Sequence, residues 1–154
     1  MSNSPIVDIG DKPSVDREAT ATGLLVLSEA TLGIIDRGEV AKGDVREAST
    51  IAAILAVKET PRLIPHCHPI PLSGCDVDWS SSAAGLRCTV RVRATWRTGV
   101  EMEALAGVSA ALLCAWDMVK PHEKDAAGQY PVTRIEDVRI VEKLKSDPTS
   151  GLPV

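Results

Sequence analysis

The sequence contains no phenylalanine, and aromatic residues make up only 3% of its 154 residues. A hydrophobic core must therefore be built from alanine, valine, leucine and isoleucine, in thin layers of small side chains. A small protomer with such a core can be short of buried apolar area, and association with further copies is one remedy. The length fits a single domain, 1–154, in which we expect residues 1–6 and 147–154 to be flexible.

Three further absences narrow the class of protein. The net charge of −4 lacks the basic excess of nucleic-acid binders, although a local cluster of lysine and arginine can still bind a phosphorylated ligand. No apolar run approaches the ~20 residues of a membrane span, and no leader pattern opens the chain. The cysteines, Cys67, Cys75, Cys88 and Cys114, form no C-x-x-C pair. We therefore expect a cytoplasmic protein with free thiols that binds neither nucleic acid nor membrane.

Capping residues predict two helices in the first half of the chain. After a short strand over 24–27, Ser28 is a natural N-cap for a helix that ends at Gly38. Asp44 and Glu47 resemble a capping box that opens a second helix, and Pro61 is expected to end it. Four positions at helical spacing are expected to form its buried face: Ala48, Ile51, Ala52 and Leu55.

The second half predicts an antiparallel hairpin and a long helix. Segments 75–79 and 86–96 have strand character, and the second alternates between apolar residues and a basic outer face that includes Arg91 and Arg93. A helix is expected over 100–120, ended by Pro121, and a last strand over 132–143. The stripe of that helix comprises Met102, Leu105, Val108, Ser109, Leu112 and Trp116. The fold class is α+β, an antiparallel sheet with helices packed on one face.

A histidine pair lies between these two halves. Three prolines in segment 63–72 exclude a regular helix or a central strand, so His66, Cys67 and His68 are expected on a rigid loop. In an extended segment the two histidines point the same way and could chelate a metal. The spacing supplies no further ligand, and local hydrogen bonding of both rings is the alternative.

Charged residues mark both ends of the helix expected over 100–120. Glu101 and Glu103 fall in its first turn, where carboxylates favour the helix dipole or could bind a polar ligand. Asp117 and Lys120, spaced i and i+3, suit a surface salt bridge or a functional pair, and Lys42 has no evident structural task. Glu103 and Asp117 are fourteen residues apart, which is ~21 Å along a helix. If both act on one small ligand, two subunits must share the site.

Several segments resemble the signatures of the cyclic pyranopterin monophosphate synthase family, also called molybdenum cofactor biosynthesis protein C. Segment 63–72, LIPHCHPIPL, resembles the family's LIPLCHPLPL. Segments 98–105 and 116–120, TGVEMEAL and WDMVK, resemble TGVEMEAL and YDMCK. Blocks 42–45 and 135–139 also match, and the likeness runs from about residue 7 to residue 143. The longer loop over 123–130 is similar to that of the archaeal-type branch.

The resemblance implies a ferredoxin-like fold, a homohexamer built as a trimer of dimers, and active sites at a subunit interface. It implies a lyase that converts (8S)-3′,8-cyclo-7,8-dihydroguanosine 5′-triphosphate into cyclic pyranopterin monophosphate and pyrophosphate. No cofactor or site metal is expected, with Mg²⁺ allowed for as a companion of the phosphates. The family's catalytic residues fall on Lys42, Asp117 and Lys120. Its substrate contacts fall on His66, Cys67, His68, Met102 and Glu103, to which we add Glu101 and Arg17.

The chain also departs from the family pattern. His66 stands where leucine is common, Val119 where cysteine is common, and Pro121 where alanine is common, and the tail over 144–154 is unmatched. A metal hydrolase built on the histidine pair and a catalytically silent binding module therefore remain as alternatives.

Two expectations concern the charges of such a site. Two close lysines should lower each other's pKa, with Asp117 opposing that shift. Arg17, Arg91 or Arg93 should hold the phosphates. A shared site also predicts that a Lys42 variant and an Asp117 variant complement each other when subunits are mixed.

Overall fold

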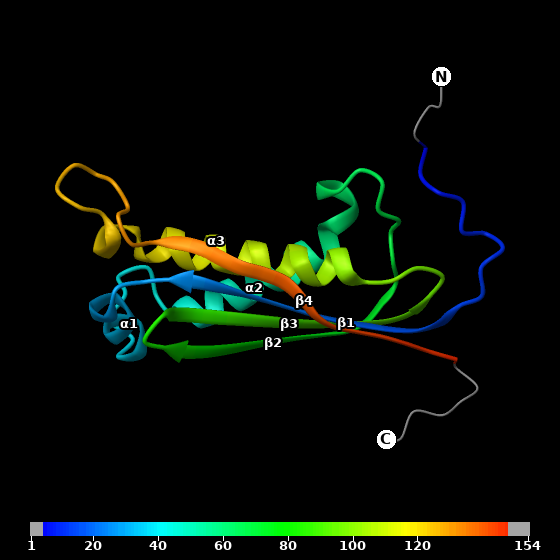
Figure 1. Cartoon of the computed structure of the whole chain (residues 1–154), viewed down its shortest axis with the longest axis horizontal. Helices are drawn as coiled ribbons and strands as arrows, with labels where there is room; N and C mark the ends of the chain where they lie inside the picture. The colour runs from blue at the N-terminus through cyan, green and yellow to red at the C-terminus, as the bar shows by residue number, and fades with distance from the viewer. Residues whose placement is uncertain (1–4, 148–154) are drawn as a thin grey trace.

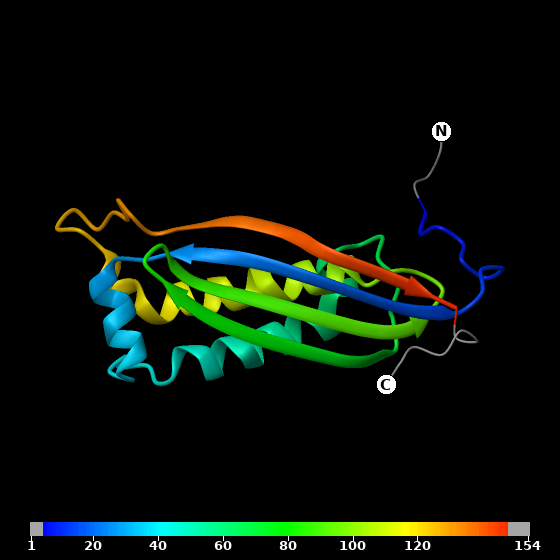
Figure 2. The same cartoon turned by 60° about the horizontal axis from the view of Figure 1, so that its bottom comes forward.

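The computed structural model describes residues 5–147. The elements in chain order are β1 (Val15–Val26), α1 (Glu29–Asp36), α2 (Val45–Leu63), β2 (Leu72–Ser82), β3 (Gly85–Trp96), α3 (Glu101–Glu123) and β4 (Arg134–Ser146). The strands form one antiparallel sheet in the order β2-β3-β1-β4. Helices α2 and α3 lie on one face of this sheet, and Figure 2 shows the opposite face open. The order and helix placement are ferredoxin-like, with the first helical connection divided into α1 and α2. The expected α+β class is confirmed.

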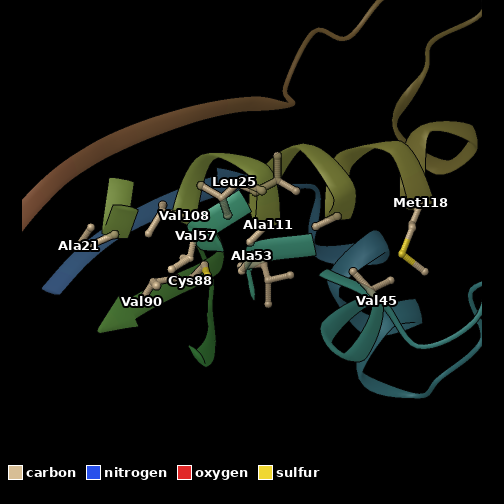
Figure 3. Packing of buried hydrophobic residues seen from close by; sticks show 14 of the residues in the cluster. Ala21, Leu25, Val45, Ala53, Val57, Cys88, Val90, Val108, Ala111 and Met118 are labelled. Carbon is tan, nitrogen blue, oxygen red and sulfur yellow. The ribbon is translucent and has the colours of Figure 1, made fainter. Parts of the chain in front are cut away.

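Small residues bring α3 close to the sheet and to α2 (Figures 1 and 3). A Cβ atom added at Gly107 would lie 2.8 Å from Cγ2 of Val57 and 3.1 Å from Cγ1 of Val90. A Cβ atom added at Gly23, in β1, would lie 2.7 Å from Cγ1 of Val108. Alanine, valine and leucine dominate the surrounding buried cluster, as the lack of phenylalanine predicted. The core is therefore thin, and α3 is held at a distance that admits no larger side chain at these points.

The buried face of α2 is not the one predicted. Ile51 and Leu55 are 55% and 57% exposed. The buried positions are Val45, Ser49, Ala53, Ala56, Val57 and Thr60. Because α3 approaches closely, the contact selects the small side chains of α2 and turns the two larger ones outward. The helix layer is thus left with exposed apolar side chains, to which Leu113 of α3 adds a third at 60% exposure.

Both long helices continue past the prolines that were expected to end them. Pro61 lies inside α2 and Pro121 lies inside α3. A proline has no backbone N–H, so the carbonyl four residues earlier loses its helical donor. At Pro61 this carbonyl belongs to Val57, and the hydroxyl of Thr60 lies 3.1 Å from it and 2.9 Å from the carbonyl of Ala56. One hydroxyl proton shared between these two carbonyls partly replaces the missing bond, and the last turn persists.

The strands are longer than, or shifted from, the expected ones. The strand expected over 24–27 extends over Val15–Val26 because β3 and β4 pair with it on both sides. The last strand begins at Arg134 rather than at residue 132. Residues 1–4 and 148–154, where flexibility was expected, lie outside the described part of the chain, while 5–6 and 147 have no regular structure.

Helix α3 also corrects the expectation that no segment is long and apolar enough to span a membrane. Glu101–Glu123 is long and apolar enough to cross a membrane by length and hydropathy alone. Half (50%) of the 18-residue apolar stretch within it is buried inside the domain. Its contacts with β1, β3 and α2 make it the central helix of the core. Its stripe is only partly as predicted, since Val108 and Leu112 are fully buried but Met102 is 42% exposed.

The close contact at Gly107 leads to a stability prediction. Gly107→Ala should destabilise the fold by about 1–3 kcal/mol, because overpacking against Val57 and Val90 outweighs the better helix propensity of alanine. The matched control is Gly33→Ala in α1, where the added methyl meets only the flexible Arg37 side chain. Urea unfolding of both variants measures the difference. Equal or increased stability of Gly107→Ala would show that the interface can relax.

Candidate active site

Two lysines and one aspartate meet at the C-terminal end of α3. Lys42 lies in the connection between α1 and α2, before Gly43, whose φ of +109° suits a glycine turn. Its Nζ atom is 2.8 Å from Oδ2 of Asp117. Nζ of Lys120, one turn further along α3, is 2.7 Å from Oδ1 of the same carboxylate. The structure therefore brings Lys42, Asp117 and Lys120 together within a single chain; we call this group the lysine–aspartate cluster.

Pro121 contributes to this geometry. Its missing N–H leaves the backbone carbonyl of Asp117 without a helical donor. Nζ of Lys42 donates to this carbonyl at 3.1 Å, in addition to its bond with the carboxylate. Lys42 thus donates to two oxygens of Asp117, the backbone carbonyl and Oδ2. Pro121, at a position where alanine is common in the family pattern, leaves the backbone carbonyl free to accept.

The charges of the cluster do not follow the sequence-based expectation. Hydrogen bonds from Lys120 and Lys42 lower the pKa of Asp117 to about 2. The hydrogen bond to Asp117 in turn raises the pKa of Lys120 above its usual value, whereas we expected neighbouring lysines to lower it. For Lys120, the hydrogen bond and the negative charge of Asp117 are the largest causes of the raised pKa. At neutral pH the cluster supplies positive charge and a protonated amine, which suits binding of phosphate or protonation of a leaving group.

A buried carboxylate anchors the elements around this cluster. Glu123, the last residue of α3, is only 7% exposed. The backbone N–H and the hydroxyl of Ser28 donate to its Oε1, at 3.1 and 2.8 Å, and Thr133 donates to its Oε2 at 2.5 Å. These bonds fix the N-cap of α1 and the approach to β4 against the end of α3. Local sequence patterns missed this anchor because its partners are distant along the chain.

A second group of predicted residues lines a cavity of about 150 Å³ at the other end of α3. The proline-rich loop and the first turn of α3 provide its walls: His66, Cys67, His68, Ile70, Thr98, Gly99, Glu101, Met102 and Glu103. Glu103 is 3% exposed, and burial raises its pKa, with a further rise from Glu101. Burial also raises the pKa of Cys67. We call this group the histidine–glutamate pocket.

Basic residues from the sheet border the histidine–glutamate pocket. Burial alone would raise the pKa of Glu101, but the hydrogen bond from Lys143 of β4 holds it below its usual value. Lys143 was not predicted, because only strand pairing brings β4 next to α3. Arg17 of β1 makes a long contact, 3.5 Å, to the carbonyl of Arg97, and its charge also lowers the pKa of Glu101. Arg17 therefore lies at the end of α3 away from the lysine–aspartate cluster, and its expected role in phosphate binding stays a prediction.

The other two arginines proposed for phosphate binding are placed differently. Side chains alternate along β3, and Arg91 and Arg93 occupy the face opposite the buried residues that contact α3. Arg91 pairs with Glu18 at 3.7 Å, and Arg93 pairs with Asp76 at 2.5 Å. Both guanidinium groups therefore form ion pairs on the open face of the sheet. The structure thus does not bring them to either group of site residues.

The two histidines of the proline-rich loop differ in their surroundings. Nε2 of His68 is 2.7 Å from the carbonyl oxygen of Val7, while His66 is exposed. Within residues 5–147, no three His, Cys, Asp or Glu side chains are grouped as metal ligands. The partner of His68 is 61 residues away in the chain, so the expected local bonding of both rings is not what the structure shows.

The two groups of site residues lie at opposite ends of α3 (Figure 1). Glu103 and Asp117 are fourteen residues apart on this one continuous helix, which corresponds to ~21 Å. Within one chain, the two groups therefore cannot surround the same small ligand.

Comparison with known proteins shows the family of this chain. The MoaC family model matches residues 6–146. The chain belongs to the MoaC family. A protein of Thermococcus kodakarensis named "Probable cyclic pyranopterin monophosphate synthase" is 54% identical over 142 residues, covering 92% of this chain and 91% of the relative. A protein of Methanoregula boonei with the same name is 55% identical over 140 residues, covering 91% and 90%. The resemblance carried by the five short segments is confirmed.

The shared carboxylate of this MoaC family member leads to a prediction about charge. Asp117→Asn should lower the pKa of Lys120, because the hydrogen bond and negative charge that now raise it are removed. NMR titration of the lysine side chains measures this shift. Asp78→Asn, on β2, removes the same charge at a distance and should leave Lys120 unchanged. An unaltered Lys120 titration in Asp117→Asn would mean that the cluster does not control this proton.

Proposed function

We propose that this chain converts (8S)-3′,8-cyclo-7,8-dihydroguanosine 5′-triphosphate into cyclic pyranopterin monophosphate and pyrophosphate, a step in molybdenum cofactor biosynthesis. The observation that carries the proposal is the lysine–aspartate cluster, in which all three predicted catalytic residues share one carboxylate. The names of the relatives support the same reaction.

The phosphorus–oxygen step gives the cluster a defined role. A sugar hydroxyl oxygen forms a bond to the α-phosphorus, the bond from that phosphorus to pyrophosphate breaks, and the hydroxyl proton passes through water to the departing pyrophosphate. The departing pyrophosphate gains negative charge, which the ammonium groups of Lys42 and Lys120 stabilise. Lys120, kept protonated by Asp117, can also donate a proton. Asp117 itself, with a pKa of about 2, is a poor base and serves to orient both amines.

The histidine–glutamate pocket would hold the ring system of the substrate. His68 and the buried Glu103 provide hydrogen-bonding groups, and Met102 adds an apolar contact. Arg17 and Lys143 are placed to meet negative charge at its border. No cofactor is part of this proposal, and Mg²⁺ would enter only as a companion of the substrate phosphates.

A complete site then requires two chains. The ~21 Å between Glu103 and Asp117 prevents one protomer from enclosing the substrate with both groups. The exposed Ile51, Leu55 and Leu113 on the helix layer give apolar surface that a partner can bury. We therefore propose a homohexamer, a trimer of dimers, located in the cytoplasm, where the four free cysteines stay reduced.

Loss of the cluster should abolish turnover without unfolding the protein. Lys42→Ala, Asp117→Ala and Lys120→Ala should each lower pyrophosphate release by at least ~10²-fold, the usual scale for a proton-transfer group. Lys124→Ala, four residues beyond Lys120 and outside the cluster, is the matched control. Full activity in any of the three would remove that residue from the mechanism. Substrate binding without pyrophosphate release by the unaltered chain would favour the silent binding module, and activity lost to a chelator would favour the metal hydrolase.

Mixed subunits test the division of the site. Lys42 and Asp117 are in contact within one chain, so the expected complementation between variants of these two residues is withdrawn. Lys42→Ala and Glu103→Gln should complement instead, because one of the two sites in each mixed pair has both groups intact. Random pairing gives roughly a quarter of the unaltered activity, whereas the pairing of Lys42→Ala with Asp117→Ala should give none. No recovery for Lys42→Ala with Glu103→Gln would contradict a shared site.

A further inference from the structure

The N-terminal segment, residues 5–14, is attached to the edge of the histidine–glutamate pocket by two backbone carbonyls. The carbonyl of Val7 is 2.7 Å from Nε2 of His68. The carbonyl of Gly10 accepts a 2.7 Å hydrogen bond from Nη1 of Arg97, which follows β3. The segment contains no helix or strand, so these side-chain contacts hold it in place. We call residues 5–14 the N-terminal arm.

The contact with Val7 determines which nitrogen of His68 carries a proton. A carbonyl oxygen can only accept a hydrogen bond, so Nε2 must be the donor. In the neutral ring the proton is then on Nε2, and Nδ1 keeps a free lone pair. Among the residues that the structure describes, Nδ1 of His68 has no hydrogen-bond partner. The arm therefore leaves His68 with one unoccupied acceptor.

His68 separates two hollows of the surface. On one side it lines a cavity of about 490 Å³ together with Ile6, Val7, Gly10, Trp96 and Arg97. On the other side it lines the histidine–glutamate pocket with Glu101 and Glu103. The ring thus lies between the arm and the place where the proposed substrate ring would bind.

We propose that the N-terminal arm is a positioning strap that holds His68 in its Nε2–H tautomer and presents Nδ1 as an acceptor to an N–H group of a guanine-derived ring. The assignment of a substrate ring to this pocket rests on the proposed function, but the tautomer does not. Carboxylates and a neutral imidazole together make the pocket rich in acceptors, which matches the N–H and amino groups along one edge of such a ring. Val7 and Arg97 act through His68 rather than by touching substrate.

Histidine NMR tests the strap without any ligand. The chain has only His66, His68 and His122, so ¹⁵N-labelled side chains can be assigned with single glutamine variants. At alkaline pH, where the rings are neutral, His68 should show a protonated Nε2 and an unprotonated Nδ1. Deleting residues 2–10 should give a mixture of tautomers, whereas deleting residues 2–4, which keeps Val7 and Gly10, should not. Arg97→Gln, which frees the arm at Gly10 only, should give a partial change if the larger deletion does not fold.

Steady-state kinetics distinguish a positioning role of the N-terminal arm from a role in the chemical step. Removing the arm should raise KM by about 3- to 10-fold, the scale of one net hydrogen bond, and change kcat less. A His68 tautomer that is the same with and without residues 2–10 would overturn the inference, even in a fully active protein. A tautomer change in a chain that releases no pyrophosphate would instead support the strap and count against the proposed reaction.

Discussion

The close approach of α3 to its neighbours is the constraint on which the molecule depends. Gly107 and Gly23 leave no room for a side chain between α3, α2 and the sheet. Without phenylalanine, the core has few large groups with which to fill a wider gap, so small residues and short distances stabilise it. The helix that results is continuous over Glu101–Glu123. Helix α3 therefore fixes the distance between the lysine–aspartate cluster and the histidine–glutamate pocket, and how the two groups are oriented.

At the C-terminal end, one carboxylate organises two amines. Asp117 accepts from Lys42 and Lys120 through different oxygens, and Pro121 leaves a backbone carbonyl to which Lys42 also donates. Both amines are exposed, so their mutual attraction through Asp117 contributes little to folding stability. Its consequence is chemical, since it concentrates positive charge at one point and keeps Lys120 protonated. At the same end of α3, Glu123 accepts hydrogen bonds from Ser28 and Thr133, which hold the N-cap of α1 and the approach to β4 against the helix.

At the N-terminal end, the same helix meets chain segments that come from three other places. The proline-rich loop, the N-terminal arm and the sheet residues Arg17 and Lys143 all converge on the first turn of α3. This end is richer in acceptors, while the other end is rich in donors. A nucleotide with a ring at one end and phosphates at the other has the complementary pattern, and a partner chain would supply the second half.

The sequence by itself determined the α+β class, the N-caps Ser28 and Asp44 and the hairpin, because capping and alternation are local properties. Its motifs also named the candidate site residues, whose roles stay predictions. It misplaced the buried face of α2 and the ends of both long helices. Those depend on how closely α3 packs and on side chains that replace lost backbone bonds. Only the tertiary structure decided that Lys42 shares the carboxylate of Asp117, that Glu123 ties three elements together and that Val7 holds His68. These partners are far apart in the chain, and only packing brings them within hydrogen-bond distance.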